Sequence, residues 1–142
     1  MEDQGIATGR SACVTLLILI LVLLPSAAPA QKAEPLRIEF DPGSNVATVH
    51  GRLRNRQLTQ YAVYSGGQLE LVLKLRSANA KSLALRLQDP FGEEITLNPA
   101  GPYRWVARLR HEGDYEIEVR RIRRKRGVST YDLTLTVNTT SK

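Results

Sequence analysis

Residues 131–137 read YDLTLTV, and this stretch decides the fold because its apolar and polar residues alternate strictly. Tyr131, Leu133, Leu135 and Val137 fall on one side of an extended chain, and the aspartate and threonines between them fall on the other. A period of two with one apolar side is typical of a strand that buries one face and exposes the other to water. The stretch therefore predicts a sheet strand that packs against a core.

The same alternation recurs upstream, between short clusters of turn-forming residues. Turns are predicted at 41–44, 89–92, 98–102 and 111–114, where proline fixes φ or glycine admits positive φ. Gly51 is interpreted as the site of a β-bulge. Short strands at this spacing indicate an antiparallel sandwich or a small barrel, and we predict an all-β, antiparallel β-sandwich. We expect about nine strands, over residues 36–40, 46–53, 61–64, 69–75, 83–87, 95–97, 103–109, 115–119 and 131–137.

The composition excludes several classes of protein. The chain has 142 residues, of which 42% are hydrophobic and 24% charged, which suits one globular domain. Its single cysteine excludes a disulfide within the chain and a zinc finger. The formal net charge of +6 is compatible with an anionic partner or with a protein that has an acidic site.

The N-terminus has the pattern of a signal peptide. The apolar run Ala12–Leu24 is too short to span a membrane but suits a signal-peptide core, and Arg10 precedes it. Small residues then lead to Ala30, after which we expect cleavage. We therefore predict a leader over residues 1–30, a sandwich domain over 31–142, and a periplasmic or secreted location. The alternative is an uncleaved membrane anchor.

The most unusual segment spans residues 120–126, where six of seven residues are basic. It lies between two predicted strands and is expected to form a hairpin loop that Gly127 helps to reverse, projecting into water because like charges repel. Three interpretations stay open. The loop can simply be solvated, its guanidiniums can bind carboxylates in an acidic cleft, or it can bind membrane phosphate or nucleic acid, the last disfavoured by export. The candidate partner-binding residues here are Arg120, Arg121, Arg123, Arg124, Lys125 and Arg126.

The sequence offers little support for an enzyme. His111, Glu112 and Asp114 could together hold a metal ion, but no second cluster completes a coordination shell, and turn formation explains the segment. Neither histidine lies near a nucleophile motif, and no phosphate-binding glycine loop precedes a helix. We therefore predict no enzyme activity, no cofactor and no metal.

A series of short motifs resembles the bacterial pre-peptidase C-terminal (PPC-like) β-sandwich. The resemblance covers nearly the whole chain after the leader, and it implies an exported, jelly-roll-like sandwich without catalysis of its own. The motifs, in chain order, are Val49-x-Gly51-x-Leu53, Tyr61-x-Val63, Gly67-Gln68-Leu69, Asp89-Pro90-Phe91-Gly92, Gly113-Asp114-Tyr115-x-Ile117-x-Val119 and Tyr131-x-Leu133-x-Leu135.

A narrower resemblance is to the periplasmic inhibitors of g-type lysozyme, in which a Gly-x-Tyr strand runs into an arginine-rich hairpin loop. That family inserts loops with arginine side chains into the acidic catalytic groove of the lysozyme. Carried over, the resemblance implies partner contacts by Arg123 and Arg126, with Gly113 and Tyr115 in the neighbouring turn. We therefore predict a monomeric, non-enzymatic binding protein whose partner is a g-type lysozyme. The alternative is an envelope accessory module that binds glycan or phosphate and inhibits nothing.

Overall fold

The computed structural model describes residues 33–122 and 127–139, and the chain from Ala33 onward forms one compact unit. In these ranges the structure contains the 3-10 turn η2 (Ala80–Ser82) and no helix that could cross a membrane. The predicted leader lies outside the described residues. The strands are β1 (Leu36–Ile38), β2 (Val46–Arg54), β3 (Leu58–Gly66), β4 (Leu69–Arg76), β5 (Leu83–Gln88), β6 (Glu94–Ile95), β7 (Asn98–Gly101), β8 (Arg104–Leu109), β9 (Glu112–Arg121) and β10 (Val128–Thr139).

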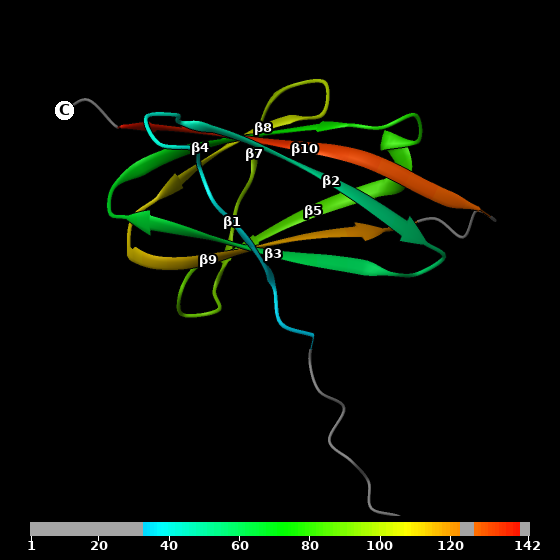
Figure 1. The fold of residues 1–142 in the computed structure, drawn as a ribbon, viewed down its shortest axis with the longest axis horizontal. Coiled ribbons are helices and arrows are strands. Elements are labelled where there is room, and N and C mark those ends of the chain that lie inside the picture. Colours follow the sequence, from blue (N-terminus) through cyan, green and yellow to red (C-terminus); the bar gives the residue numbers. More distant parts are fainter. Residues whose placement is uncertain (1–32, 123–126, 140–142) are drawn as a thin grey trace, which may run out of the picture. The chain divides into compact units, whose positions relative to one another are not determined.

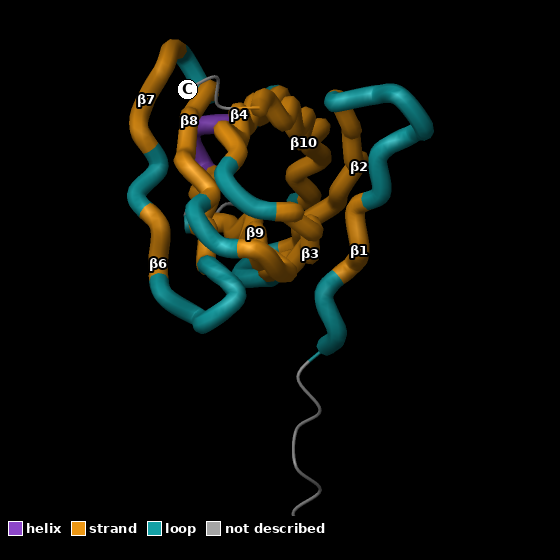
Figure 2. Tube along the Cα trace, turned by 90° about the vertical axis from the view of Figure 1, so that its left-hand side faces the viewer, coloured by secondary structure: helices purple, strands orange, loops and turns teal. Residues whose placement is uncertain are grey.

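The strands form two five-stranded sheets (Figure 1). One sheet has the order β1-β3-β9-β5-β6 and the other has the order β2-β10-β4-β8-β7. Figure 2 shows them as two layers, with β8, β4 and β10 in one and β9 and β3 in the other. The predicted all-β sandwich is confirmed. One pairing is not antiparallel, because β1 runs parallel to β3.

The core lies between the sheets and follows from the alternation along each strand. Leu71, Leu73 and Leu75 of β4 belong to the same buried cluster as Tyr115 and Ile117 of β9, and each of these five side chains is at most 2% exposed. Burying one such leucine contributes about 1.5–3 kcal/mol. The hydroxyls of Tyr61 and Tyr131 pair in a 2.8 Å hydrogen bond, whereas Oγ of Ser129 is buried without a partner in the described residues. The apolar faces that the sequence indicates therefore do form a single core.

Gly51 does not form the predicted bulge. Its strand β2 pairs with β10 in unbroken register, with Gly51 opposite Tyr131. A Cβ at position 51 would lie 2.1 Å from Cζ of Tyr131. The glycine is therefore required by the close approach of an aromatic ring rather than by a backbone irregularity.

A further strand, β7, lies where a turn was predicted. Its residues pair with β8, and the register shifts between Pro99 and Gly101. Proline and a shifted register are tolerated here because β7 is at the edge of its sheet. The predicted turns at 41–44 and 89–92 are present, and at 41–44 the amide of Ser44 donates to the carbonyl of Asp41 at 2.8 Å. The turn predicted at 111–114 is wrong, because Glu112, Gly113 and Asp114 pair with β3 as the first residues of β9.

Candidate partner-binding site

The basic segment begins inside a strand rather than in a loop. Strand β9 continues through Arg121, so the expectation that the loop starts at Arg120 is wrong. Backbone pairing explains the longer strand, because Arg120 lies opposite Leu58 of β3 and Ala84 of β5. Four of the predicted contact residues, Arg123, Arg124, Lys125 and Arg126, lie outside the described residues, and their role stays a prediction. Strands β9 and β10 lie in different sheets and each pairs with other strands, so the segment between them connects the two sheets and the predicted β-hairpin is wrong. We use the word hairpin only as the name of this chain reversal, and we call the end of the sandwich where β9 ends and β10 begins the hairpin end.

Arg121 points into the sandwich instead of into water. It follows Tyr115, Ile117 and Val119 on the inward side of β9 and is only 7% exposed. Its Nη1 donates to the carbonyl of Gly127 at 2.7 Å, which ties the end of β9 in one sheet to the residue that precedes β10 in the other. Nε of Arg121 is buried without a hydrogen-bond partner in the described part of the chain. Arg121 is therefore a brace at the base of the hairpin, and the sequence could not separate it from the outward arginines.

Arg120 is on the outward side of β9 and is available to a partner. Its side chain is 55% exposed, and its Nε lies 3.9 Å from a carboxylate oxygen of Glu118. An exposed pair at this distance contributes little and competes weakly with an incoming carboxylate. Among the described cations of the basic segment, Arg120 is the one that can meet a partner directly.

Gly113 and Tyr115 do not neighbour the basic hairpin. They lie at the start of β9, and the eight residue steps from Gly113 to Arg121 span about 26 Å in an extended strand. The fully buried Tyr115 accepts a hydrogen bond from the amide of His111 and donates one to its carbonyl, both at 2.9 Å. Gly113 has φ of 138° and no room for a Cβ beside Pro90.

These contacts give the Gly-x-Tyr motif a folding role, because the tyrosine closes the corner that leads into β9, as in other β-sandwiches. They explain the motif without a partner. A direct role of Gly113 and Tyr115 in binding therefore stays a prediction, and it would involve the end of the sandwich opposite the hairpin.

The three side chains that the sequence suggests as metal ligands, those of His111, Glu112 and Asp114, each contact a different neighbouring residue. Glu112 accepts a 2.6 Å hydrogen bond from the hydroxyl of Tyr64, which raises the pKa of that tyrosine. Asp114 accepts two hydrogen bonds from the guanidinium of Arg37, at 2.8 and 3.1 Å. The ring of His111 packs edge-on against a phenylalanine. Residues 33–122 and 127–139 contain no cluster of three such ligands.

Several cations that the sequence analysis did not select also lie at the hairpin end. Arg54 is opposite Val128, and Arg52 is opposite Thr130, so strand pairing brings β2 to the base of the hairpin. Arg76 ends β4 opposite Asp132 of β10. A search of local sequence could not find these residues, because only the pairing of β10 with both β2 and β4 brings them together.

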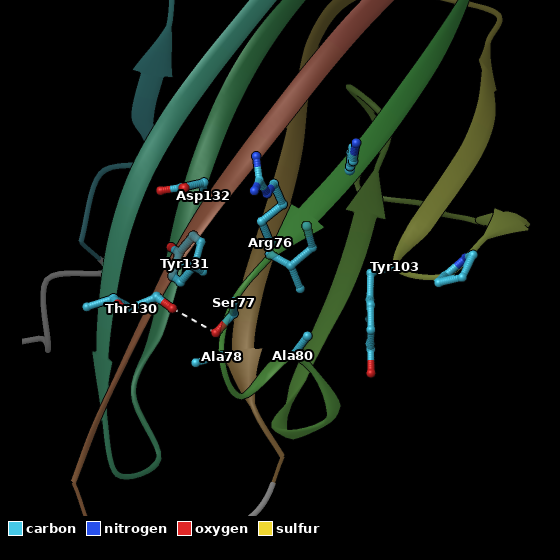
Figure 3. A pocket seen from close by; sticks show the side chains of 11 residues that line it. Arg76, Ser77, Ala78, Ala80, Tyr103, Thr130, Tyr131 and Asp132 are labelled. Atoms are coloured by element: carbon cyan, nitrogen blue, oxygen red, sulfur yellow. Dashed lines mark hydrogen bonds between the residues drawn. The ribbon is translucent and has the colours of Figure 1, made fainter.

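A hollow of about 550 Å³ opens at this end, between the end of β4, the start of β8 and β10 (Figure 3). Arg76, Tyr103 and Thr130 are among its lining residues, and the Ser77 hydroxyl donates to the carbonyl of Thr130 at 2.7 Å. Its polar groups and its arginine can receive an acidic side chain. The hairpin end therefore combines a braced hairpin, exposed guanidiniums and a polar hollow.

The comparisons with known proteins identify the class of fold. The sandwich is similar to the pre-peptidase C-terminal domain of a collagenase from Bacillus anthracis, with a TM-score of 0.55, 15% identity, and coverage of 75% of this chain and 98% of that one. The resemblance expected from the sequence is thus confirmed for the fold. No family model matches the sequence, and no curated protein is significantly similar to it.

Two solved structures of lysozyme inhibitors are also similar. The periplasmic inhibitor of g-type lysozyme from Aeromonas hydrophila, PliG, matches with a TM-score of 0.64 and 16% identity, over 73% of this chain and 96% of the inhibitor. The PliG of Salmonella Typhimurium matches with a TM-score of 0.61 and 18% identity, over 75% of this chain and all of the inhibitor. At these identities the similarity establishes a shared fold.

Proposed function

We propose that the protein is a non-enzymatic inhibitor that binds a g-type lysozyme through the hairpin end of its sandwich. The observation that carries this proposal is the combination of a fold shared with two such inhibitors and a basic hairpin braced by Arg121. A braced hairpin loses less conformational freedom on binding than an unsupported one, which favours its use as a contact surface.

Inhibition would rest on ion pairing in the catalytic cleft of the lysozyme. A guanidinium binds a carboxylate through two parallel hydrogen bonds, and the pair is strongest where the cleft excludes water. Arg120, Arg123 and Arg126 are the proposed donors, and the hollow beside Arg76 would hold a further acidic side chain of the enzyme. Such a complex blocks access of the cell-wall glycan to the catalytic carboxylate.

A cell-wall lysis assay tests this function. Purified protein is added to g-type, c-type and i-type lysozymes, and the rate of turbidity loss is recorded at increasing protein concentration. We expect inhibition of the g-type enzyme. Absence of inhibition of all three enzymes would reject the proposal and leave an accessory module as the remaining candidate.

We further propose that residues 1–30 are a leader removed on export to the periplasm or the medium. The supporting observation is the sequence pattern before Ala30, since the compact unit begins at Ala33. Mass spectrometry of protein isolated from the periplasm and medium is expected to give Gln31 as the first residue. An intact N-terminus in the membrane fraction would overturn this proposal.

A further inference from the structure

The outer face of the sheet β2-β10-β4-β8-β7 carries a concentration of positive charge. Its cations point away from the core on three of the five strands, and all are exposed. We call these residues the basic face: Arg52 and Arg54 on β2, Lys74 and Arg76 on β4, and Arg104 and Arg108 on β8. The strands from β2 to β8 span about 14 Å, so the cations form a band rather than a point.

The cations of the basic face are not neutralised by the protein itself. None of them is in an ion pair with a carboxylate of residues 33–122 or 127–139. Two acidic residues lie in register with members of the basic face. Asp132 is opposite Arg76 but contacts His50 at 2.5 Å, and Glu70 is opposite Arg108 without forming an ion pair within 4 Å. The charge of the basic face is therefore available to an external anion.

The opposite sheet provides the contrast. The outward positions of β9 are occupied by Glu112, Asp114, Glu116 and Glu118, followed by Arg120. On that face each outward arginine has an acidic neighbour, as in the 2.8 Å pairs of Arg37 with Asp114 and of Arg86 with Glu94. The two outer faces thus differ in sign, and the excess of cations is specific to one of them.

The arrangement of the basic face is unfavourable for the protein alone. Lys74 of β4 lies directly opposite Arg104 of β8. Like charges in directly opposed cross-strand positions destabilise a sheet. An anion bound over this pair would relieve the repulsion, so the arrangement indicates a ligand.

We propose that the basic face binds an extended anionic polysaccharide, a sugar chain carrying carboxylate, sulfate or phosphate groups. The strand between the cation-bearing strands, β10, presents Thr130, Thr134 and Thr136 outward, and β2 presents Thr48. Hydroxyl groups can donate to and accept from sugar hydroxyls, while the flanking cations bind the acidic groups.

Other polyanions fit this face less well. Recognition of single-stranded nucleic acid relies on aromatic side chains on which bases stack, and the outward positions of β2, β4, β8 and β10 hold no phenylalanine, tyrosine or tryptophan. Insertion into a membrane surface requires large apolar side chains, whereas the outward apolar residues of these strands are valines such as Val46 and Val106. The basic face shares Arg52, Arg54 and Arg76 with the hairpin end, but it also extends along β4 and β8, and binding of a polysaccharide there does not depend on the proposed inhibition of lysozyme.

Binding to heparin, a sulfated polysaccharide, tests the proposal. The chain from Gln31 onward, the proposed exported form, is titrated with heparin at about 0.1 M salt. The double variant Lys74→Gln/Arg104→Gln is compared with the double variant Arg37→Gln/Arg86→Gln. Both variants lose two positive charges, but only the first loses them from the basic face. We expect at least a tenfold loss of affinity for the first variant and less than a twofold loss for the second. The slope of log affinity against log salt should fall by about 2 in the first variant alone.

Three results would overturn the proposal. Equal losses in the two variants would mean that heparin senses only net charge. Equally tight binding of a duplex DNA of matched charge would mean that the face binds any polyanion, as an anion exchanger does. Loss of heparin binding in Arg123→Ala/Arg126→Ala, with retention in Lys74→Gln/Arg104→Gln, would place the site on the hairpin. Circular dichroism and thermal melting confirm that each variant is folded, and the lysis assay is read separately.

Discussion

The ring of Tyr131 occupies the space that a side chain at position 51 would need, since a Cβ on Gly51 would lie 2.1 Å from its Cζ atom. Gly51→Ala therefore forces the ring or strand β2 to move. We expect the free energy of unfolding to fall by about 2 kcal/mol, as in other overpacked sites. Chemical denaturation measures this change.

A second glycine serves as the control for that substitution. Gly66 lies in strand β3, and a Cβ there would meet no atom within 4 Å. Gly66→Ala should change stability by less than about 1 kcal/mol. Equal effects of the two substitutions would show that the Tyr131 contact is not what requires a glycine at position 51.

The hydrogen bond from Arg121 to the Gly127 carbonyl predicts a local effect on amide hydrogen exchange. Arg121→Met puts an unbranched apolar side chain in place of the arginine, and this side chain cannot donate to the Gly127 carbonyl. Replacing a buried cation by an apolar residue can be neutral in overall stability, so we expect little change in melting temperature. Hydrogen exchange of the nearby Ile122 amide, which donates to Ser82, should accelerate severalfold. Similar acceleration in the outward variant Arg120→Met would contradict the assignment of the brace.

The proposed contacts of the hairpin predict a loss of inhibition. Arg123→Ala and Arg126→Ala should each weaken binding to the lysozyme by about 1 kcal/mol or more, as expected for arginines at the centre of an interface. The measurement is the inhibition constant in the lysis assay. The matched control is Arg37→Gln/Arg86→Gln, which removes the same charge from another surface. Unchanged inhibition by the double variant Arg123→Ala/Arg126→Ala would remove the hairpin from the mechanism.

The role of Tyr115 in the corner predicts a stability effect without an effect on binding. Tyr115→Phe leaves the amide and carbonyl of His111 without their shared partner. We expect stability to fall by about 1 kcal/mol, because these partly buried backbone groups lose their hydrogen-bond partner. Inhibition measured well below the melting temperature should be unchanged. A large loss of inhibition in a folded variant would restore Tyr115 as a contact residue.

The buried tyrosine pair predicts a loss of stability at high pH. Burial raises the pKa of Tyr61, and the hydrogen bond to Tyr131 raises it further. Because the unfolded chain releases this proton near pH 10 while the folded chain keeps it, stability is complete below about pH 10 and declines above it. Denaturation curves between pH 8 and 11, as a planned series, should show a smaller alkaline decline for Tyr61→Phe than for the unsubstituted protein.

The sequence predicts the sandwich well where alternation is local. Strands such as β4 and β10 can be recognised in the sequence because apolar residues occupy every second position. Strand β7 was missed because Pro99 and Gly101 are turn residues by local chemistry, and only pairing with β8 makes them extended. The parallel pairing of β1 was likewise set by contacts that are distant in the sequence.

The candidate site was predicted only in part. A run of like charges marks the hairpin, but charge alone does not say which side of a strand a residue occupies, so Arg121 was grouped with Arg120. The two ends of β9 were also treated as neighbours, although Gly113 and Arg121 are separated by most of the length of the strand. The basic face was missed because its members come from three strands that only the folded sheet brings together.

The proline in edge strand β7 has a consequence for how copies of the protein behave at high concentration. Pro99 has no amide hydrogen to donate, and the register shift beside it distorts the rim of the sheet. A strand from another molecule cannot continue the sheet evenly there. Growth of the protein into fibrils by edge-to-edge polymerisation is blocked at this rim.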